Sequence, residues 1–451
     1  MASLFQFLGG GPRAQFVDLI ASSKPRKDAA EKRLLFYRDC QAEHLFKVIA
    51  AKWSKPESFR LFQINAVKKI INRRATVYVG KPIRTFEGMD QAAGEQLYRD
   101  LGADLVLKTA SRLTKLLKTC ALQVMHDGTR LRLAVIPSNV LDAEWADPDN
   151  PTRLVVTHLG ERAELTEYSD WTSTSFTRRD WRGNPISVAG NPDGTNPYGI
   201  LPFVPLFDYA PVEGEFFLTG GDDLIEAQEA INVALTNLWR AIELQSHGQA
   251  WASGLPTNST EIPVGPDKTI NLPENGEFGF AQPNAPIEQV LSALEFVLKQ
   301  TAVMNDLSAN TFEIQPLAES GTAKEAERRD LIEARQDDLE LWRGYETKLF
   351  EVIKVVANTH APGSVPEDAT VRVDFAEIDQ AISENERLDS YQKRLDMGIA
   401  SPVDILMAEN PDIRTREEAL ELLLQQREEA AQLGQPFALP PTDTGGDNGG
   451  A

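Results

Sequence analysis

Apolar residues recur at spacings of three and four over several long stretches of the chain, a period that predicts amphipathic helices. The predicted helices of the first third are 28–52, 58–74 and 93–126. Leu122 falls within the apolar repeat of the last of these. Between the second and the third helix, residues 75–86 are rich in β-branched and aromatic residues and contain Gly-Lys-Pro, which predicts a strand with a bend.

The pattern changes between about residues 130 and 212, where short apolar or alternating runs are separated by Pro, Asn, Gly and Asp. Such runs are typical of an antiparallel sheet. We expect its large aromatic residues to pack in the core and on sheet faces: Trp145, Tyr168, Trp171, Phe176 and Trp181.

Helical periodicity returns in 221–248, which carries an apolar face over its whole length. The next segment, 249–286, is rich in Gly, Pro, Asn and Thr and predicts a small β structure. A second amphipathic helix is predicted for 287–307. The loop that follows, 308–322, is partly apolar and is interrupted by proline and a Ser-Gly pair.

The longest helical pattern runs from Thr322 to His360, and we expect Gly344 to break it mildly. Residues 369–375 predict one returning strand. The predicted helical region 377–433 has breaks near Gly398 and Asn410. After it, residues 434–451 are too polar and too rich in Pro and Gly to order themselves.

This order of elements predicts an architecture. Two antiparallel helices crowned by a small β lobe form a stalk, and the chain contains too few neighbouring helices to cover the apolar stripe on each. Identical stalks in a closed ring, joined by head-to-tail interfaces, would cover the stripes. In such a ring the loop 308–322 would project toward the axis.

A chain of 451 residues, 42% hydrophobic and 25% charged, is long enough for two or three domains. Its only cysteines, Cys40 and Cys120, exclude a disulfide framework, and we expect both to fill space. We find neither a membrane-spanning run nor a signal-peptide pattern and therefore expect a cytosolic protein.

The formal net charge of −21 is unevenly distributed. Residues 1–85 contain 17 Lys and Arg against 6 Asp and Glu, whereas residues 366–451 contain 7 against 19. Phosphate contacts supply most of the affinity of sequence-independent nucleic-acid binders, which are therefore usually basic. We expect this protein not to grip nucleic acid over its whole surface.

Motifs of catalysis are absent from the sequence: no phosphate-binding loop, dinucleotide fingerprint, His-Glu-x-x-His or nucleophile elbow occurs. We expect solvated or hydrogen-bonded roles for the five histidines. For the pairs Asp222-Asp223 and Asp337-Asp338 we expect helix capping and a solvated face rather than magnesium binding. The sequence thus favours a protein that is not an enzyme and has no cofactor or metal. A metal-dependent nuclease and a ring-shaped virion adaptor that binds only protein remain as alternatives.

Five stretches, taken in order, resemble the portal proteins of tailed double-stranded DNA bacteriophages. They are "NAVKKIINRRATVYVGKPI" (65–83), "NPYGILPFVPL" (196–206), "DDLIEAQEAINVALTNLW" (222–239), "NDLSANTFEIQPLAESGTAKE" (305–325) and "RLDMGIASPVDIL" (394–406). The resemblance covers about residues 60–430.

The resemblance implies an α+β portal fold with a helical and β wing, a two-helix stem, a small α/β clip, a long kinked helix and a C-terminal helical crown. It implies these boundaries: wing 1–220, stem helices 221–248 and 287–307, clip 249–286, tunnel loop 308–322, long wing helix and returning strand 323–376, crown 377–433, and disordered tail 434–451.

It also implies a ring, usually of twelve subunits, at one vertex of the capsid, through which DNA is packaged and ejected. The implied partners are other copies of the chain, the terminase large subunit (transiently), head-completion adaptor proteins, and the major capsid and scaffolding proteins. Double-stranded DNA would pass through the channel without sequence-specific binding, and no membrane is involved. The protein would be made in the host bacterial cytoplasm and reside in the virion.

Four groups of site residues follow from this picture. The tunnel loop would use Phe312, Glu313, Ile314, Gln315, Pro316, Leu317, Glu319 and Gly321. Basic positions that could line the channel are Lys299, Lys324 and Arg328, and ion pairs with nearby Glu and Asp are an equal alternative for them. The clip residues that would contact terminase or adaptors are Trp251, Leu255, Ile262, Phe278 and Phe280. Stem packing would involve Leu224, Ile231, Leu235, Leu238, Leu294 and Val297.

Overall fold

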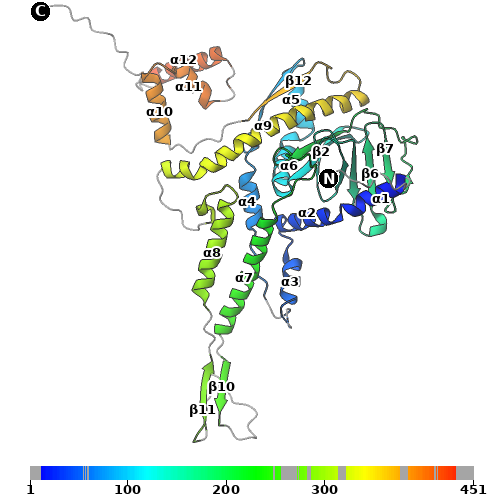
Figure 1. Ribbon diagram of the computed structural model, residues 1–451. Coiled ribbons are helices and arrows are strands. Elements are labelled where there is room, and N and C mark those ends of the chain that lie inside the picture. The colour runs from blue at the N-terminus through cyan, green and yellow to red at the C-terminus, as the bar shows by residue number, and fades with distance from the viewer. Residues whose placement is uncertain are drawn as a thin grey trace, which may run out of the picture. The chain divides into compact units, whose positions relative to one another are not determined.

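The computed structural model is a mixed helix and sheet protein (Figure 1). It describes residues 12–53, 55, 57, 60–246, 249–254, 272, 274–281, 286–312, 321–375, 384–410, 413 and 415–432. The chain divides into two compact units, one of residues 1–317 with 327–378 and the other of 318–326 with 379–451. No helix within the described ranges has the length and apolarity needed to cross a membrane.

Helices of the N-terminal region surround one large core. They are α1 (Pro12–Ser22), α2 (Lys24–Tyr37), α3 (Ala42–Ala50), α4 (Ala66–Arg74), α5 (Gln91–Asp100) and α6 (Ala103–Leu117). The predicted helix 28–52 is wrong as one element, because the chain turns at Asp39 with a positive φ of 65°. The predicted helix 58–74 is also too long: it begins only after Asn65, whose side chain accepts a hydrogen bond from the backbone N–H of Lys68.

The sheets contain the strands predicted between 130 and 212 and three more. A three-stranded sheet has the order β3-β2-β9 and a five-stranded sheet the order β4-β5-β6-β7-β8. The first contains β2 (Thr119–His126), β3 (Leu131–Pro137) and β9 (Phe203–Phe207). The second contains β4 (Leu141–Glu144), β5 (Arg153–His158), β6 (Glu167–Thr172), β7 (Phe176–Arg179) and β8 (Pro185–Ile186), with the 3-10 turn η3 (Ala163–Leu165) between β5 and β6. Neighbouring strands in both sheets pair antiparallel.

Strand β2 corrects the prediction of a helix over 93–126, which instead forms α5, α6 and then this strand. β2 pairs on both sides, with β3 and β9, and six of its eight residues are buried. A strand buried on both faces is apolar throughout, so its sequence does not alternate and can fit a helical repeat. Leu122, assigned to a helix face, lies in the centre of this strand and is fully buried.

The aromatic residues of the β region divide between core and surface. Trp171 is buried, and Phe176 stacks on it with a centroid distance of 4.1 Å. Trp145 is 38% exposed but packs against the buried Phe216, whereas Trp181 is 42% exposed, so the prediction of core packing is wrong for Trp181. Of the two cysteines, Cys120 is buried, but Cys40 is exposed and does not fill space in the core.

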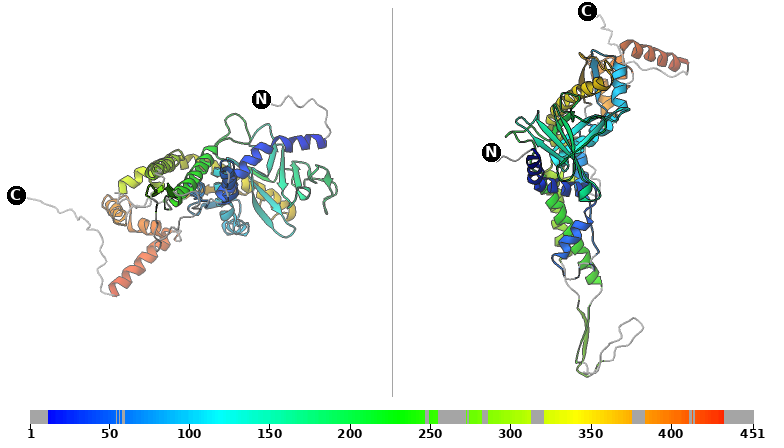
Figure 2. Two further views of the ribbon diagram at one scale, coloured as in Figure 1. Left: turned by 90° about the horizontal axis from the view of Figure 1, so that it is seen from below. Right: turned by 90° about the vertical axis from the view of Figure 1, so that its right-hand side faces the viewer.

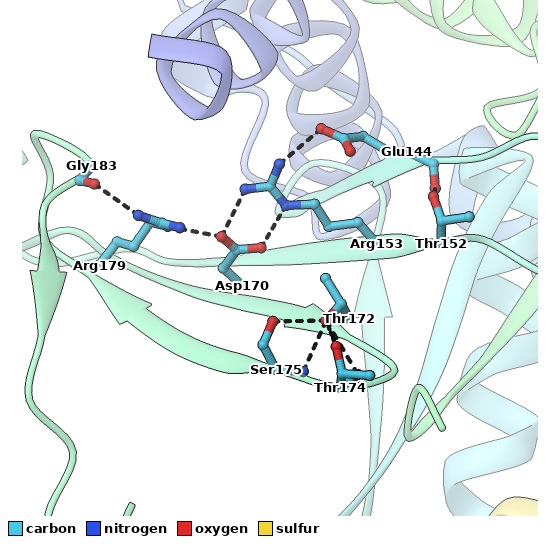
Figure 3. Close-up of polar contacts among 9 residues, drawn as sticks. All are labelled: Glu144, Thr152, Arg153, Asp170, Thr172, Thr174, Ser175, Arg179 and Gly183. Atoms are coloured by element: carbon cyan, nitrogen blue, oxygen red, sulfur yellow. Dashed lines mark hydrogen bonds and ion pairs between the residues drawn. The ribbon is translucent and has the colours of Figure 1, made fainter. Parts of the chain in front are cut away.

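The five-stranded sheet carries a buried charge cluster on one face (Figure 3). Asp170 on β6 is 5% exposed and accepts hydrogen bonds from Arg153 (2.7 Å) and from Arg179 (2.8 Å). Arg153 also bonds Glu144, and Arg179 bonds the carbonyl of Gly183. Both guanidinium groups lie over the ring of Phe16, through which α1 docks on the sheet.

Replacing Asp170 with asparagine is expected to lower the free energy of unfolding by about 1–3 kcal/mol at neutral pH, because the arginines lose a charged acceptor. Burial would raise the pKa of Asp170, but the bonds from Arg153 and Arg179 outweigh it and hold the pKa below its usual value. A carboxyl with a lowered pKa stabilises the fold above its unfolded pKa of about 3.9, and the contribution is lost as pH falls through the lower folded value.

Urea denaturation of the wild type and of Asp170→Asn at several pH values measures this contribution. The gap between the two proteins should be widest near neutral pH and should close below about pH 4. A gap that does not change with pH would contradict the account of this cluster.

The part of a long helix from Glu327 onward and a returning strand complete the first unit. Helix α9 (Gly321–His360) has 40 residues and continues through Gly344, so the predicted break there is wrong. Strand β12 (Thr370–Asp374) pairs antiparallel with β1 (Ile83–Glu87), which is shorter than the predicted strand 75–86. Two buried ionic groups hold α9 to the rest of the first unit. Lys115 pairs with Asp208 (2.9 Å) and Asp338 (2.7 Å), and Arg84 pairs with Glu346 (2.7 Å). Asp338, for which we expected a solvated position, is therefore buried.

The second unit contains three C-terminal helices, α10 (Glu384–Asp396), α11 (Pro402–Glu409) and α12 (Arg416–Gln432). Its breaks lie near Gly398 and Asn410, as predicted. Helix α11 begins with a capping box in which Ser401 and Asp404 bond each other's backbone N–H. Arg416 at the start of α12 pairs with Asp404 at 3.0 Å. Residues 434–451, predicted as a disordered tail, lie outside the described residues.

Candidate stem and channel elements

Two amphipathic helices run side by side at the positions predicted for the two stem helices (Figures 1 and 2). They are α7 (Asp222–Ser246) and α8 (Ile287–Val303), close to the bounds predicted from the sequence. Ile231, Leu238 and Leu294 are at most 8% exposed and form the centre of the interface between the helices. Leu235 and Val297 pack against this centre and are partly buried. Leu224, also predicted for the stem, lies instead in the main core of the wing.

One side of α7 carries a ladder of buried polar residues that sequence analysis missed. Gln228, Asn232 and Thr236 are spaced four residues apart and are each at most 1% exposed. The amide oxygen of Gln228 accepts from the backbone N–H of Ala66 at 2.7 Å, and its amide nitrogen donates to the carbonyl of Ile64 at 3.0 Å. The ladder therefore binds the backbone of the segment before α4.

The next two rungs bind the same segment. Asn232 accepts from the backbone N–H of Ile64 (3.1 Å) and donates to the side chain of Gln41 (2.9 Å). Thr236 accepts from the backbone N–H of Phe62 at 3.1 Å. These long-range bonds satisfy backbone groups that a helix would satisfy internally, which explains why 60–65 is not helical. The sequence signal that could have revealed this ladder is the spacing of four residues between its three polar members, inside the apolar stripe of α7.

Charged residues of α2 and α3 form ion pairs with Asp222 and Glu229 of α7. Arg33 pairs with Asp222 (2.7 Å) at the first residue of α7, so Asp222 has an ionic partner beyond its place at the helix start. Glu229 accepts from Lys32 and from His44, each at 2.9 Å. Burial would raise the pKa of Glu229, but its bonds to Lys32 and His44 lower it below the usual value. Glu229 therefore stays ionised between these partners.

The segment after α8 packs back against α4 and the main core. Asp306 has a positive φ of 58° and pairs with Arg74 of α4 at 3.1 Å. The 3-10 turn η4 (Ala309–Phe312) follows, and the Lys69 ammonium lies 4.7 Å from the centroid of the Phe312 ring. Phe312 also packs against the main core. These contacts lie within the chain, and the contact of Phe312 with neighbouring subunits stays a prediction.

The remaining tunnel-loop residues, Glu313, Ile314, Gln315, Pro316, Leu317 and Glu319, lie outside the described residues. Gly321 is the first residue of α9, the position expected for the start of the long helix. Lys324 and Arg328 belong to the first turns of α9, where the structure does not describe the side chains. Their roles stay predictions.

Lys299 on α8 forms an ion pair with Glu295 one turn before it, at 2.9 Å, and its side chain is 34% exposed. This is the acidic partner that the sequence offered as the alternative to a DNA contact. A paired lysine presents less net charge toward a channel than a lone one, but the pair is exposed and weak.

The hairpin beyond the stem helices corresponds to the predicted clip. Strands β10 (Gln249–Ser253) and β11 (Glu277–Ala281) pair antiparallel, with Trp251 opposite Gly279. A Cβ on Gly279 would lie 3.0 Å from the Trp251 ring, so this position requires glycine or movement of the ring. Trp251 and Phe280 are 44% and 53% exposed, and Phe278 packs edge-on to Phe280. Leu255 and Ile262 lie outside the described residues.

Among the residues that the structure describes, no three His, Cys, Asp or Glu side chains lie close enough to hold a metal ion. His126 and His360 stack on each other at 4.1 Å, and His158 shares a hydrogen bond with Ser169. His126 and His360 also have hydrogen-bond partners, so these three histidines agree with the expected hydrogen-bonded roles, whereas the stacking was not predicted.

Comparison with known proteins gives the family. The sequence pattern of the family described as "Phage portal protein, SPP1 Gp6-like" matches residues 55–433. Among solved structures, "Virion of native gene transfer agent (GTA) particle" is similar, at 12% identity and a TM-score of 0.42 over 88% of this chain and 94% of that chain. "Neck of native GTA particle computed with C12 symmetry" gives 10% identity and a TM-score of 0.43 over 82% and 89%. No curated protein matches the sequence. The chain belongs to the SPP1 Gp6-like family of phage portal proteins.

Proposed function

We propose that the chain assembles into a closed ring of about twelve subunits at one capsid vertex, and that this ring is the channel for packaging and ejection of double-stranded DNA. In the ring α7 and α8 form the stem, β10 and β11 form the clip, and α10–α12 form the crown. The ring is a passive conduit without catalysis of its own.

The observation that carries the proposal is the unburied apolar surface of α8. Among the described side chains, three apolar residues are buried in the cluster between α7 and α8, whereas large apolar side chains elsewhere on α8 and just after it are open to solvent. They are Leu291 (49% exposed), Phe296 (67%), Val303 (53%) and Met304 (65%). Full burial of one such side chain stabilises an interface by roughly 1.5–3 kcal/mol. A head-to-tail ring would cover this surface in every subunit.

The charge of the chain fits a channel through which DNA slides. Each phosphate that a protein neutralises adds salt-dependent affinity, and a strongly basic lining would hold the duplex. The net charge of −21 disfavours such retention, and Lys299 is paired with Glu295.

The exposed aromatic residues of the hairpin, Trp251 and Phe280, offer an anchor of the type common at protein interfaces. We assign to this hairpin the docking of the terminase large subunit and later of head-completion adaptors.

Replacing Phe296 with glutamate is expected to reduce the ring fraction at least about tenfold at equal protein concentration, because a charge would be buried between subunits. The control is Leu159→Glu, which places the same charge at a 71% exposed apolar residue outside the stem. Native mass spectrometry reports the ring fraction, and circular dichroism shows that both variants are folded. Rings of Phe296→Glu in wild-type yield would overturn the assignment of α8 to the subunit interface.

A further inference from the structure

Strands β1 and β12 form a two-stranded sheet with one edge closed by a side chain. The Gln91 side chain on α5 accepts from the backbone N–H of Phe86 at 3.0 Å and donates to the carbonyl of Arg84 at 2.7 Å. Gln91 thus takes the place of a neighbouring strand along β1. It also shows that the backbone groups of Arg84 and Phe86 point away from β12.

The pairing register then fixes which groups of β12 point outward. Arg84 lies opposite Val373, and Phe86 lies opposite Val371. In an antiparallel pair, residues opposite each other either exchange both hydrogen bonds or both point outward. The backbone N–H and C=O of Val371 and Val373 therefore point to the far edge of the sheet. Within the described part of the chain, none of these four groups has a hydrogen-bond partner.

Elsewhere the chain closes such edges with side chains. The outward carbonyl of Ala369, just before β12, accepts from the Lys354 ammonium at 3.0 Å. On β9 the Tyr345 hydroxyl bonds both the N–H and the carbonyl of Phe207, and on β4 the Arg26 guanidinium donates to the carbonyl of Leu141. Exposed strand edges are sites of strand addition unless they are blocked. The edge at Val371 and Val373 is left open.

A groove runs along this open edge between β12 and α9. It has a volume of about 380 Å³ and is lined by Arg343 and Thr347 of α9 and by residues 371–374. Gly344 lies next to it on the exposed side of α9, and a Cβ built there meets nothing within 4 Å. No contact within the chain requires glycine at this position, and glycine is a poor helix former. A bare stretch of helix beside an open strand edge allows close approach of another backbone.

A second hollow adjoins the end of the sheet where Ile83 pairs with Asp374, so it borders the same end of the groove. Ile83, opposite Asp374, is 64% exposed, and beyond it this hollow of about 300 Å³ is lined in part by Val79 and Leu105, which are 61% and 74% exposed. The cationic residues on the face around the groove and this hollow are Lys81, Lys108, Arg343 and Arg372, beside Asp104, Asp374 and Glu340. The chain as a whole has a net charge of −21, whereas cationic residues slightly outnumber acidic ones on this face. In charge, this face is therefore complementary to the rest of the molecule.

We propose that a neighbouring copy of the chain occupies this groove and adds an extended segment to the open edge of β12, over Gly344. The inference rests on the proposed ring, in which every subunit presents the same face to the next. Strand addition would supply partners for the outward groups of Val371 and Val373, and their alternation would fix the register between subunits. The exposed Val79, Ile83 and Leu105 would be covered at the same interface.

Hydrogen–deuterium exchange at single-residue resolution tests the contact directly. Intact rings and unassembled subunits are separated by size before labelling. The amides of Val371 and Val373 are expected to exchange at least about tenfold more slowly in the ring. The amide of Arg372, which points toward β1, serves as the internal control and should change little. Equal exchange of Val371 and Val373 in both fractions would overturn the proposal.

A variant gives an independent test. Gly344→Arg places a long side chain in the groove without a clash inside the chain, and it should lower the ring fraction at least about tenfold. The control is Thr359→Arg, which adds the same side chain at another exposed residue of α9. Normal assembly of Gly344→Arg overturns the inference and leaves the proposed ring intact. If the wild type itself forms no ring, the proposed function fails. If the valine amides are protected only after another virion protein is added, the assignment to a second copy is wrong.

Discussion

Replacing Glu346 with alanine is expected to lower the free energy of unfolding by about 3–5 kcal/mol, because it leaves a buried charge without its partner. The Glu346 side chain is completely buried. Its carboxylate accepts from the Tyr78 hydroxyl (2.8 Å) and from two nitrogens of Arg84 (2.7 and 3.1 Å). Arg84 keeps only its bond to Asp104, and the hydroxyl of Tyr78 loses its acceptor.

The control for this variant is Glu340→Ala. Glu340 lies on the same helix and pairs with Arg343, but its side chain is 77% exposed. An exposed pair of this kind contributes about 0–1 kcal/mol. Urea denaturation followed by circular dichroism measures both losses. Similar small losses for the two variants would show that Glu346 does not anchor α9 to β1.

The second large effect is expected for Lys115→Met, with a loss of about 3–5 kcal/mol at neutral pH. Lys115 lies between the carboxylates of Asp208 and Asp338, whose side chains are 6% and 7% exposed. Without Lys115, Asp208 keeps Lys118 at 2.7 Å, but Asp338 loses its cation. The control is Lys348→Met, which removes an exposed ion pair with Asp149.

The loss should depend on pH in a defined direction. Burial raises the pKa of Asp338 even though Lys115 opposes it, and removal of Lys115 raises this pKa further. A carboxyl whose folded pKa lies above its unfolded value destabilises the fold above the folded pKa and not below the unfolded one. The deficit of Lys115→Met should therefore shrink as pH falls from about 7 toward about 4.

A double variant separates the charge effect from lost packing. Lys115→Met with Asp338→Leu removes both buried charges and should recover part of the stability that Lys115→Met loses. Urea denaturation at pH 7 measures the recovery. A double variant less stable than Lys115→Met would contradict the view that Asp338 is left as an uncompensated buried charge.

Helices α7 and α8, the hairpin and the long helix could be predicted from the sequence because the patterns that indicate them lie within the segments themselves. An apolar stripe continues over whole turns of α7 and α8, and Gly- and Pro-rich segments mark where each helix ends. The same local patterns predicted the breaks at Gly398 and Asn410. The order of these elements also identified the family correctly.

Other features depend on contacts between distant residues. Residues 60–65 have a helical pattern, but their backbone bonds go to Asn232 and Thr236 on α7. Leu122 has helical spacing from its neighbours, but β3 and β9 enclose its strand. The free-energy cost of glycine in a helix at Gly344 is smaller than the stabilisation from the packing of the adjacent turns, which include the buried Tyr345 and Glu346. Local propensity is a weak guide where tertiary contacts decide the structure.

The site residues show the same division. Positions on an apolar face, such as Ile231, Leu238 and Leu294, could be predicted as stem core because burial follows periodicity. The direction that a charged side chain takes cannot be read from periodicity. Lys299 bonds Glu295, and Asp338 is buried against Lys115 from a helix distant in sequence. Phe312 turns inward to Lys69 because Asp306 redirects the chain after α8.

The central claim, a ring around a channel, is tested most directly by the mass and image of the purified wild-type protein under native conditions. Native mass spectrometry should give a closed assembly of about twelve 49.9 kDa subunits, and negative-stain images of the same sample should show a central hole wide enough for a DNA duplex. A monodisperse monomer or dimer at high protein concentration would contradict the account, because the exposed apolar residues of α8 would then remain uncovered.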